Sequence, residues 1–297
     1  MGAHAIDAGA GEYRIDDLRP LDARQFAVAV RKLANGLLYG LDRSPFIGSG
    51  IEYVQSRPWV DGDSVRAIDW RVTARTRKVH VKEFETPRSL PTWLMLDTSA
   101  SMTVQSGPVS KYELAVRVAG GIAFACLDRV SPVGIVSLGE RALRLQPSMS
   151  KVKVLEWMLA LRDYRGDERT HLAPRVRELA TSAPQRSLVV VLSDLHDESA
   201  TPALRALSQL HDVVVLRLED PAERGLRGAG IVRARHAEGG AGFVARGSKL
   251  GAPDLERGDD DLRRAGIDVL VLRVDQPVEA PLRNLFKNRG RTGQGTR

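Results

Sequence analysis

The sequence of 297 residues contains one cysteine, 5% aromatic residues and no apolar run longer than six residues. One cysteine cannot form an internal disulfide, and Cys126 lies within the longest apolar run, Ile122 to Leu127, where we expect a small core residue. A bilayer-spanning helix needs roughly 18 to 20 apolar residues. Met1 to Leu18 also lack the apolar segment of a secretory signal. We therefore expect a cytoplasmic protein without a membrane span.

Two motifs of common enzyme classes are absent as well. The sequence has no G-x-x-x-x-G-K-[ST] phosphate-binding loop and no G-x-S-x-G nucleophile motif. Its histidines, at positions 80, 171, 196, 211 and 236 among others, have no metal-ligand spacing between them. His171 and His196 each lie close to residues that we single out below, and surface-loop histidines are the simpler interpretation of both.

The net charge of +7 is unevenly distributed. Residues 57–82 contain seven bases and three acids, and residues 281–297 contain five bases and no acid. Such a balance is compatible with binding to nucleic acid or to an anionic membrane surface. The simpler interpretation is a solvated surface and a frayed basic tail, because the bases are rarely interleaved with aromatic residues and no nucleic-acid motif is present.

Hydrophobic periodicity predicts an α/β protein with a doubly wound, mainly parallel sheet. A helix is expected near residues 22–35, with Asp22 as its N-cap, Asn35-Gly36 as its stop and an apolar stripe of Phe26, Val30, Leu33 and Leu37. Short apolar runs then predict strands at 93–96, 134–138, 188–192, 213–218 and 269–274, an edge strand at 141–145, and weak strands at 231–234 and 243–246. Amphipathic stretches between them predict helices at 111–128, 152–161, 172–181 and 202–210.

These elements suggest four parts. We expect a disordered N-terminus over 1–20, a helix and an irregular segment over 21–87, an α/β domain over 88–280, and a basic tail over 281–297. The irregular segment alternates acids and bases around Trp59 and Trp70. We interpret it as an ion-pair network that locks irregular backbone onto the α/β domain, and a partner-docking surface is the alternative.

Oxygen-bearing residues follow two of the predicted strands. The first strand ends in Asp97-Thr98-Ser99-Ala100-Ser101, and the strand at 188–192 ends in Ser193-Asp194. Open α/β sheets bind ligands outside the carboxyl ends of their strands. If the two strands are neighbours, both carboxylates face one crevice, and Thr170, before the helix at 172, could add a hydroxyl. Hard oxygen ligands of this kind suit Mg²⁺.

With these residues in these positions, the chain resembles a von Willebrand factor A domain that carries a metal-ion-dependent adhesion site. The resemblance implies that Asp97, Ser99 and Ser101 supply the first ligand loop, Thr170 the second and Asp194 the third. It also implies Mg²⁺ as the ion, with Mn²⁺ as the alternative, and one coordination position open for an acidic group of a protein partner.

The preceding segment resembles the bacterial domain of unknown function 58 family. The resemblance rests on the strings Gly48-Ser49-Gly50-Ile51-Glu52-Tyr53, Arg57, Asp61-Gly62-Asp63, Arg66, Ile68-Asp69-Trp70, Ala74-Arg75 and Asp220-Pro221-Ala222-Glu223, within a span from about Arg24 to Arg289. Ser131-Pro132 and His196 depart from its usual pattern. Members of the family are commonly associated with MoxR-type AAA+ ATPases, which implies an adaptor or co-chaperone partner of such an ATPase.

We therefore expect a non-enzymatic, magnesium-dependent protein-interaction module. The enzyme alternative is a phosphoaspartate-type hydrolase, in which a second acid two residues after the nucleophile serves as general acid and base. Ser99 stands at that position, and a hydroxyl cannot replace the carboxylate. Peripheral contact with an anionic membrane through the basic tail is compatible with the first expectation.

Overall fold

The computed structural model describes residues 23–38, 52–61, 63–85, 90–164, 167–183, 185–197, 199–224, 231–234, 243–246 and 255–292. Its centre is a six-stranded sheet in the order β10-β7-β6-β3-β4-β5. The strands are β3 (Thr92–Leu96), β4 (Val133–Ser137), β5 (Arg144–Ser148), β6 (Leu188–Ser193), β7 (Asp212–Glu219) and β10 (Asp268–Arg273). Neighbouring strands are parallel except β4 and β5, which are antiparallel. The predicted α/β class with a mainly parallel sheet is confirmed.

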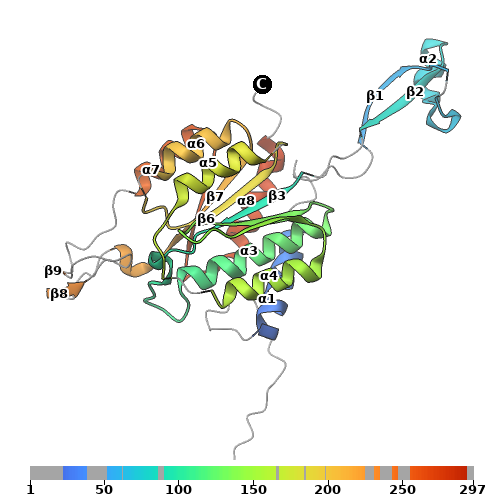
Figure 1. The fold of residues 1–297 in the computed structure, drawn as a ribbon. Coiled ribbons are helices and arrows are strands. Elements are labelled where there is room, and N and C mark those ends of the chain that lie inside the picture. Colours follow the sequence, from blue (N-terminus) through green and yellow to red (C-terminus); the bar gives the residue numbers. More distant parts are fainter. Residues whose placement is uncertain are drawn as a thin grey trace, which may run out of the picture.

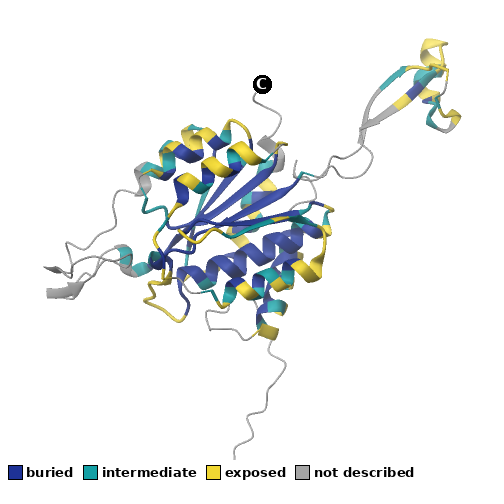
Figure 2. Cartoon of the chain, in the orientation of Figure 1, coloured by how far each residue is buried: buried dark blue, intermediate teal, exposed yellow. Residues whose placement is uncertain are grey.

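Helices cover both faces of this sheet (Figure 1). One face packs against α1 (Ala23–Leu38), α3 (Lys111–Asp128), α4 (Lys151–Arg162) and α8 (Glu279–Thr292), and the other against α5 (Leu172–Ser182), α6 (Ala200–Ser208) and α7 (Leu255–Arg264). Successive residues of β3 alternate between the two cores, with Leu94 in the first and Met95 in the second. Both faces are apolar because both are covered, and Figure 2 shows the inner strands β3, β4, β6 and β7 buried.

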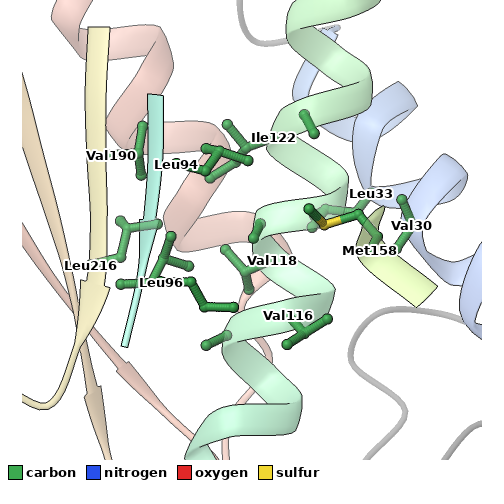
Figure 3. Packing of buried hydrophobic residues seen from close by; sticks show 14 of the residues in the cluster. Val30, Leu33, Leu94, Leu96, Val116, Val118, Ile122, Met158, Val190 and Leu216 are labelled. Carbon is green, nitrogen blue, oxygen red and sulfur yellow. The ribbon is translucent and has the colours of Figure 1, made fainter. Parts of the chain in front are cut away.

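Helix α3 lies between the sheet and α1 (Figure 3). Its residues Val118 and Ile122 pack toward Leu94 and Leu96 of β3, and α1 brings Val30 and Leu33 to its other side. The close approach of the two helices depends on glycine, because a Cβ at Gly120 would lie 2.8 Å from Val30 Cγ2. The apolar stripe of α1 is thus covered, as its periodicity predicts.

The helix α1 continues beyond the predicted stop at Asn35-Gly36, and its predicted N-cap, Asp22, lies outside the described residues. Gly36 lies inside the helix. A Cβ at this position would approach the Glu279 side chain at the start of α8, so the packing of the two helices favours glycine here. The next residue, Leu37, is 1% exposed. Burial of Leu37, the last residue of the predicted apolar stripe, outweighs the helix-breaking tendency of the glycine.

Two other predicted elements differ from the structure. The edge strand begins at Arg144 instead of Arg141, because Ser137 Oγ donates to Arg141 O and accepts from Leu143 N, which holds residues 141–143 in a turn. Residues expected to form a frayed basic tail instead form α8, whose Leu282 and Phe286 are buried in the core. The helix α7 was also not predicted, since its charged sequence carries few apolar residues.

A separate small unit precedes the sheet. It consists of β1 (Glu52–Pro58) and β2 (His80–Glu85), paired antiparallel, with a 3₁₀ turn η1 (Val65–Ala67) and α2 (Trp70–Thr76) between them. Figure 1 shows this unit standing away from the six-stranded sheet, which differs from the expected packing onto the α/β domain. Its two strands form hydrogen bonds with each other. Among residues 56–82 with described burial, only Asp69 and Val81 are buried.

The short strands β8 (Ile231–Ala234) and β9 (Phe243–Arg246) pair antiparallel at the predicted positions. Among the helices described, none is long and apolar enough to cross a membrane.

Candidate functional site at the carboxyl ends of β3 and β6

The site forms where the strand order reverses. From β3 the chain continues to β4 and β5 on one side of the sheet, and later to β6 and β7 on the other. Leu96 of β3 is aligned with Leu192 of β6, and Asp97 N donates to Leu192 O at 2.9 Å. The two strands are neighbours in the sheet, which is the condition that the sequence analysis set for a shared site. Asp97 and Asp194 therefore follow adjacent strand ends, at the place where open α/β sheets bind ligands.

Asp97 is held rigidly in a buried position. It is 1% exposed, its Oδ1 accepts from Ser99 N at 3.0 Å, and its Oδ2 accepts from Ser193 Oγ at 2.5 Å. Burial and the negative charge of Asp194 raise the pKa of Asp97, and the hydrogen bonds from the two serines offset part of this rise. Burial is the larger cause, and the charge of Asp194 adds to it by further disfavouring ionisation of Asp97.

Ser99 and Ser101 face each other across the turn after β3. The 3₁₀ turn η2 (Ala100–Thr103) reverses the chain, so that Ser99 Oγ and Ser101 Oγ lie 3.1 Å apart. Ser99 is fully buried. Ser101 lies close enough to Asp194 to help lower the pKa of that carboxyl. The predicted D-x-S-x-S residues thus converge with Asp194 on one small volume.

A second loop brings Thr170 to the same end of the sheet. Thr170 forms an isolated bridge with Gly139 after β4, and the next residue, His171, donates its backbone N–H to Leu138 O at 2.6 Å. The Thr170 side chain is half-buried. Among the described residues its hydroxyl has no hydrogen bond to Asp97 or Asp194.

Glu168 joins the two loops, and the sequence analysis did not identify it as a site residue. Its carboxylate accepts from Thr98 Oγ1 at 2.5 Å, from Arg141 N at 2.6 Å and from Tyr164 OH at 3.0 Å. Its backbone O accepts from Ala100 N. Although burial opposes ionisation, the hydrogen bonds lower the pKa of Glu168. A Cβ at Gly139 would overlap this carboxylate, so the loop requires glycine there.

Lys111 is a further site residue that the sequence analysis missed. It is the first residue of α3, it is fully buried, and its Nζ lies 2.7 Å from Asp194 Oδ2 and also contacts Glu223. Burial disfavours the ammonium, yet the charges of Asp194 and Glu223 outweigh burial and raise the pKa of Lys111. Burial alone would raise the pKa of Asp194. The positive charge of Lys111 contributes to the opposite effect, and the pKa of Asp194 is lowered.

Glu223 lies in the Asp220-Pro221-Ala222-Glu223 string, which forms the 3₁₀ turn η3 (Pro221–Arg224) after β7. Its Oε2 accepts from Asp220 N at 3.1 Å, while the Asp220 carboxylate accepts from Ser106 N at 2.9 Å. The string therefore fixes a third loop against the segment that follows Ser101.

The two histidines beside the predicted ligands differ from each other. His171 is exposed, as expected for a loop histidine. His196 departs from that expectation, because its Nδ1 lies 3.4 Å from Asp194 Oδ2 and its Nε2 lies 3.8 Å from Glu223 Oε1. Asp194, His196 and Glu223 bring ligand atoms within 4.8 Å of one another. Lys111 already contacts both of these carboxylates, so the ammonium competes with any ion at that trio.

The charge of the cluster leaves room for a divalent cation. Asp97, Asp194 and Glu223 carry three negative charges when ionised, and Lys111 supplies one positive charge. Buried charges are tolerated when they are paired. Two negative charges remain when all three carboxylates are ionised, and the surrounding ligand atoms are hard oxygens. This donor set fits Mg²⁺ or Mn²⁺, both of which prefer oxygen ligands.

Comparison with known proteins identifies the family. Residues 55–248 match the family model described as "Protein of unknown function DUF58", and the chain belongs to this family. The uncharacterized proteins Mb1516 of Mycobacterium bovis and Rv1480 of Mycobacterium tuberculosis are each 29% identical over 298 residues, covering 93% of this chain and 92% of each relative.

A solved structure also aligns, the "Crystal structure of Deinococcus radiodurans RO (RSR) protein", at 16% identity and a TM-score of 0.38. The alignment covers 96% of this chain and 49% of that one, so the chain spans about half the length of the aligned protein. A score at this level carries no argument about fold or function.

Proposed function

We propose that this protein is a non-enzymatic interaction module of the von Willebrand factor A type, which binds a protein partner through a magnesium-dependent site. The supporting observation is the convergence of Asp97, Ser99, Ser101 and Asp194 at a buried switch point with two uncompensated negative charges. In this proposal those four residues hold the ion, and Thr170 belongs to the second ligand loop. Mn²⁺ can take the place of Mg²⁺.

The bound ion would offer a coordination position to a carboxylate of the partner. The protein itself contributes three fixed loops: the D-x-S-x-S turn, the Glu168 to Thr170 segment and the η3 string. Lys111 keeps Asp194 and Glu223 in place and reduces the negative charge of the site. We therefore expect weak metal binding that strengthens when a partner supplies a further acid.

A MoxR-type AAA+ ATPase is the proposed partner, with this protein as its adaptor or co-chaperone. This part of the proposal rests on the family resemblance. The rim around Ser99, Thr170 and Asp194 would be the contact surface, and the partner's carboxylate would reach the buried Ser99 and Asp194 through the ion.

The metal site is tested by calorimetric titration of the full chain with Mg²⁺. We expect a saturable heat for the wild type, none for Asp97→Ala, and a wild-type heat for the control Asp163→Ala, because the Asp163 side chain is 70% exposed. Little loss of fold is expected in Asp97→Ala, since the substitution also removes repulsion between two carboxylates. Equal heats for wild type and Asp97→Ala would refute the site.

The interface is tested by capture of a purified MoxR-type ATPase at fixed ionic strength. We expect capture with Mg²⁺, release by a chelator without unfolding, and loss of capture in Asp194→Ala. Binding through a basic surface would instead weaken steadily with salt and ignore the chelator. Equal capture under all three conditions would exclude the metal site as the interface.

A further inference from the structure

The β1–α2–β2 unit uses two of its carboxylates, Asp63 and Asp69, to hold its own backbone. Asp63 accepts two hydrogen bonds from Arg57, each 2.7 Å long. Asp69 caps α2 by accepting from Arg71 N at 3.1 Å and Val72 N at 3.2 Å, and it also accepts from Ser56 Oγ at 2.6 Å. The acids therefore fix the backbone of the unit, and they hold α2 against β1.

Several basic side chains of the unit have no such role. Arg71, Arg75 and Lys82 are exposed. Lys82 interacts electrostatically with Asp69, whereas within the described part of the chain Arg71 and Arg75 have no ion pair. Arg71 and Arg75 are four residues apart in α2, so they lie on the same face of the helix. Their charge is available to a ligand.

These bases surround a hollow that also has an apolar lining. The hollow, here called the Trp70 hollow, has a volume of about 630 Å³ and is lined by Ile68, Asp69, Trp70, Arg71, Val72, Arg75 and Lys82. Its three cations outnumber its one carboxylate, which is occupied by Ser56 and the backbone. The volume lies within the range of pockets that bind small ligands or anchoring side chains.

Large apolar side chains are exposed in the same unit. Trp70 is 68% exposed and Val65 is 69% exposed, and Trp59, Val60 and Val79 are also exposed. Tryptophan and arginine are enriched among residues that dominate binding energy at protein interfaces. Exposed aliphatic residues beside a cationic hollow favour a ligand that carries both carboxylates and apolar side chains, since phosphodiesters offer no aliphatic counterpart to the valines.

We propose that the β1–α2–β2 unit docks an acidic polypeptide segment, with an apolar side chain against Trp70 and carboxylates against Arg71, Arg75 and Lys82 in the Trp70 hollow. This surface is separate from the proposed metal site and belongs to a unit that stands away from the sheet (Figure 1). Docking here requires no ion, so the two proposals can fail independently.

The test uses the full chain and a fluorescently labelled synthetic peptide of alternating glutamate and leucine. The variant Arg71→Gln/Arg75→Gln removes two charges that line the hollow. The control Arg77→Gln/Lys78→Gln removes the same charge from the same unit outside the hollow. We expect peptide affinity measured by fluorescence anisotropy to fall about tenfold or more in the first variant and in Trp70→Ala, and less than about twofold in the control. A chelator should not change the affinity.

Two results would overturn the proposal. An equal loss in both double variants would show that the peptide responds only to net charge. Tighter binding of a single-stranded oligothymidylate than of the peptide, with the same dependence on Arg71 and Arg75, would assign the surface to nucleic acid. Circular dichroism of each variant checks that the ladder and α2 remain folded.

Discussion

Charged residues have opposite roles in two regions of this molecule. At the carboxyl ends of β3 and β6, Lys111 and Asp194 are buried and each depends on the other. In the β1–α2–β2 unit, Arg71 and Arg75 are exposed, and among the described residues their side chains have no ion-pair partner. A buried charge must be compensated inside the fold, whereas an exposed charge is solvated and can be used by a ligand. The two regions should therefore respond differently to the same kind of substitution.

The largest effect is expected from Lys111→Met. The substitution leaves the buried Asp194 and the half-buried Glu223 without their cation, and removing one partner of a buried ion pair costs about 3–5 kcal/mol. Urea unfolding in the presence of a chelator should show this loss. If the proposed metal site exists, Mg²⁺ should restore more stability to the variant than it adds to the wild type, because the ion binds a more negative site.

The control for this prediction is Arg205→Met, at an exposed position of α6. It should unfold close to the wild type with or without Mg²⁺. If Lys111→Met also unfolds at the wild-type urea concentration, the buried ion pair does not hold these loops together.

The position of each charge in the fold also explains which site residues could be predicted from the sequence and which were missed. Asp97 and Asp194 could be predicted, because each follows an apolar run and the carboxyl ends of parallel strands share one edge. Lys111 could not, because its partners lie 83 and 112 residues away and only the fold brings them together. Nothing in the sequence around position 111 distinguishes a buried lysine from an exposed one.

The prediction of helices from the sequence was limited in the same way, because contacts between distant residues decide some of them. Periodicity predicted α3 with its exact bounds, and in the structure a capping box at Ser110 fixes its start. It did not predict α8, since the many bases over 281–297 concealed the buried Leu282 and Phe286. Charge runs thus suggested a tail where packing against the sheet produces a helix. The alternating charges around Trp59 and Trp70 also suggested an ion-pair network that locks this segment onto the α/β domain. Figure 1 shows the segment as a separate unit.

A second buried pair tests whether the comparison extends beyond the site. Arg217 in β7 and Asp259 in α7 are each 3% exposed, and the guanidinium donates to the carboxylate at 2.8 and 3.0 Å. Asp259→Ala should cost about 3 kcal/mol in urea unfolding, at the lower end of the range for a broken buried pair, because Glu219 remains 3.6 Å from Arg217.

The matched substitution in the exposed unit is Asp63→Ala, which breaks the Arg57–Asp63 pair. Its unfolding midpoint should stay close to that of the wild type. A larger loss in Asp63→Ala than in Asp259→Ala would reverse the comparison, and would make the β1–α2–β2 unit a determinant of global stability.

A smaller effect is expected from Asp97→Asn, and its sign depends on pH. Because the folded-state pKa of Asp97 is raised, the folded protein binds this proton more tightly than the unfolded chain, whose aspartate pKa is about 3.9. In a chelator, the contribution of Asp97 to stability is therefore most favourable at low pH and is lost as pH rises through the folded pKa. Asp97→Asn should remove this dependence and stabilise the metal-free protein at pH 8 by about 1 kcal/mol.

The measurement compares the free energy of unfolding of wild type and Asp97→Asn at pH 5 and pH 8, with a chelator throughout. The difference between the two proteins isolates Asp97 from other titrating groups. A difference that does not change with pH would mean that neither burial nor the charge of Asp194 raises the pKa of Asp97. The argument for a cation at this position would then lose its electrostatic basis.

The smallest effect on stability is expected from Trp70→Ser. A side chain that is 68% exposed contributes little to folding, and surface substitutions usually change stability by no more than about 0.5 kcal/mol. Val81→Ala in the same unit should cost more, about 1.5 kcal/mol at roughly 0.8 kcal/mol for each buried CH₂, because Val81 is 2% exposed. Hydrogen exchange of the β1–β2 ladder measures both effects within the unit. If Trp70→Ser weakens the ladder as much as Val81→Ala does, Trp70 is a structural residue and its exposure does not mark a binding surface.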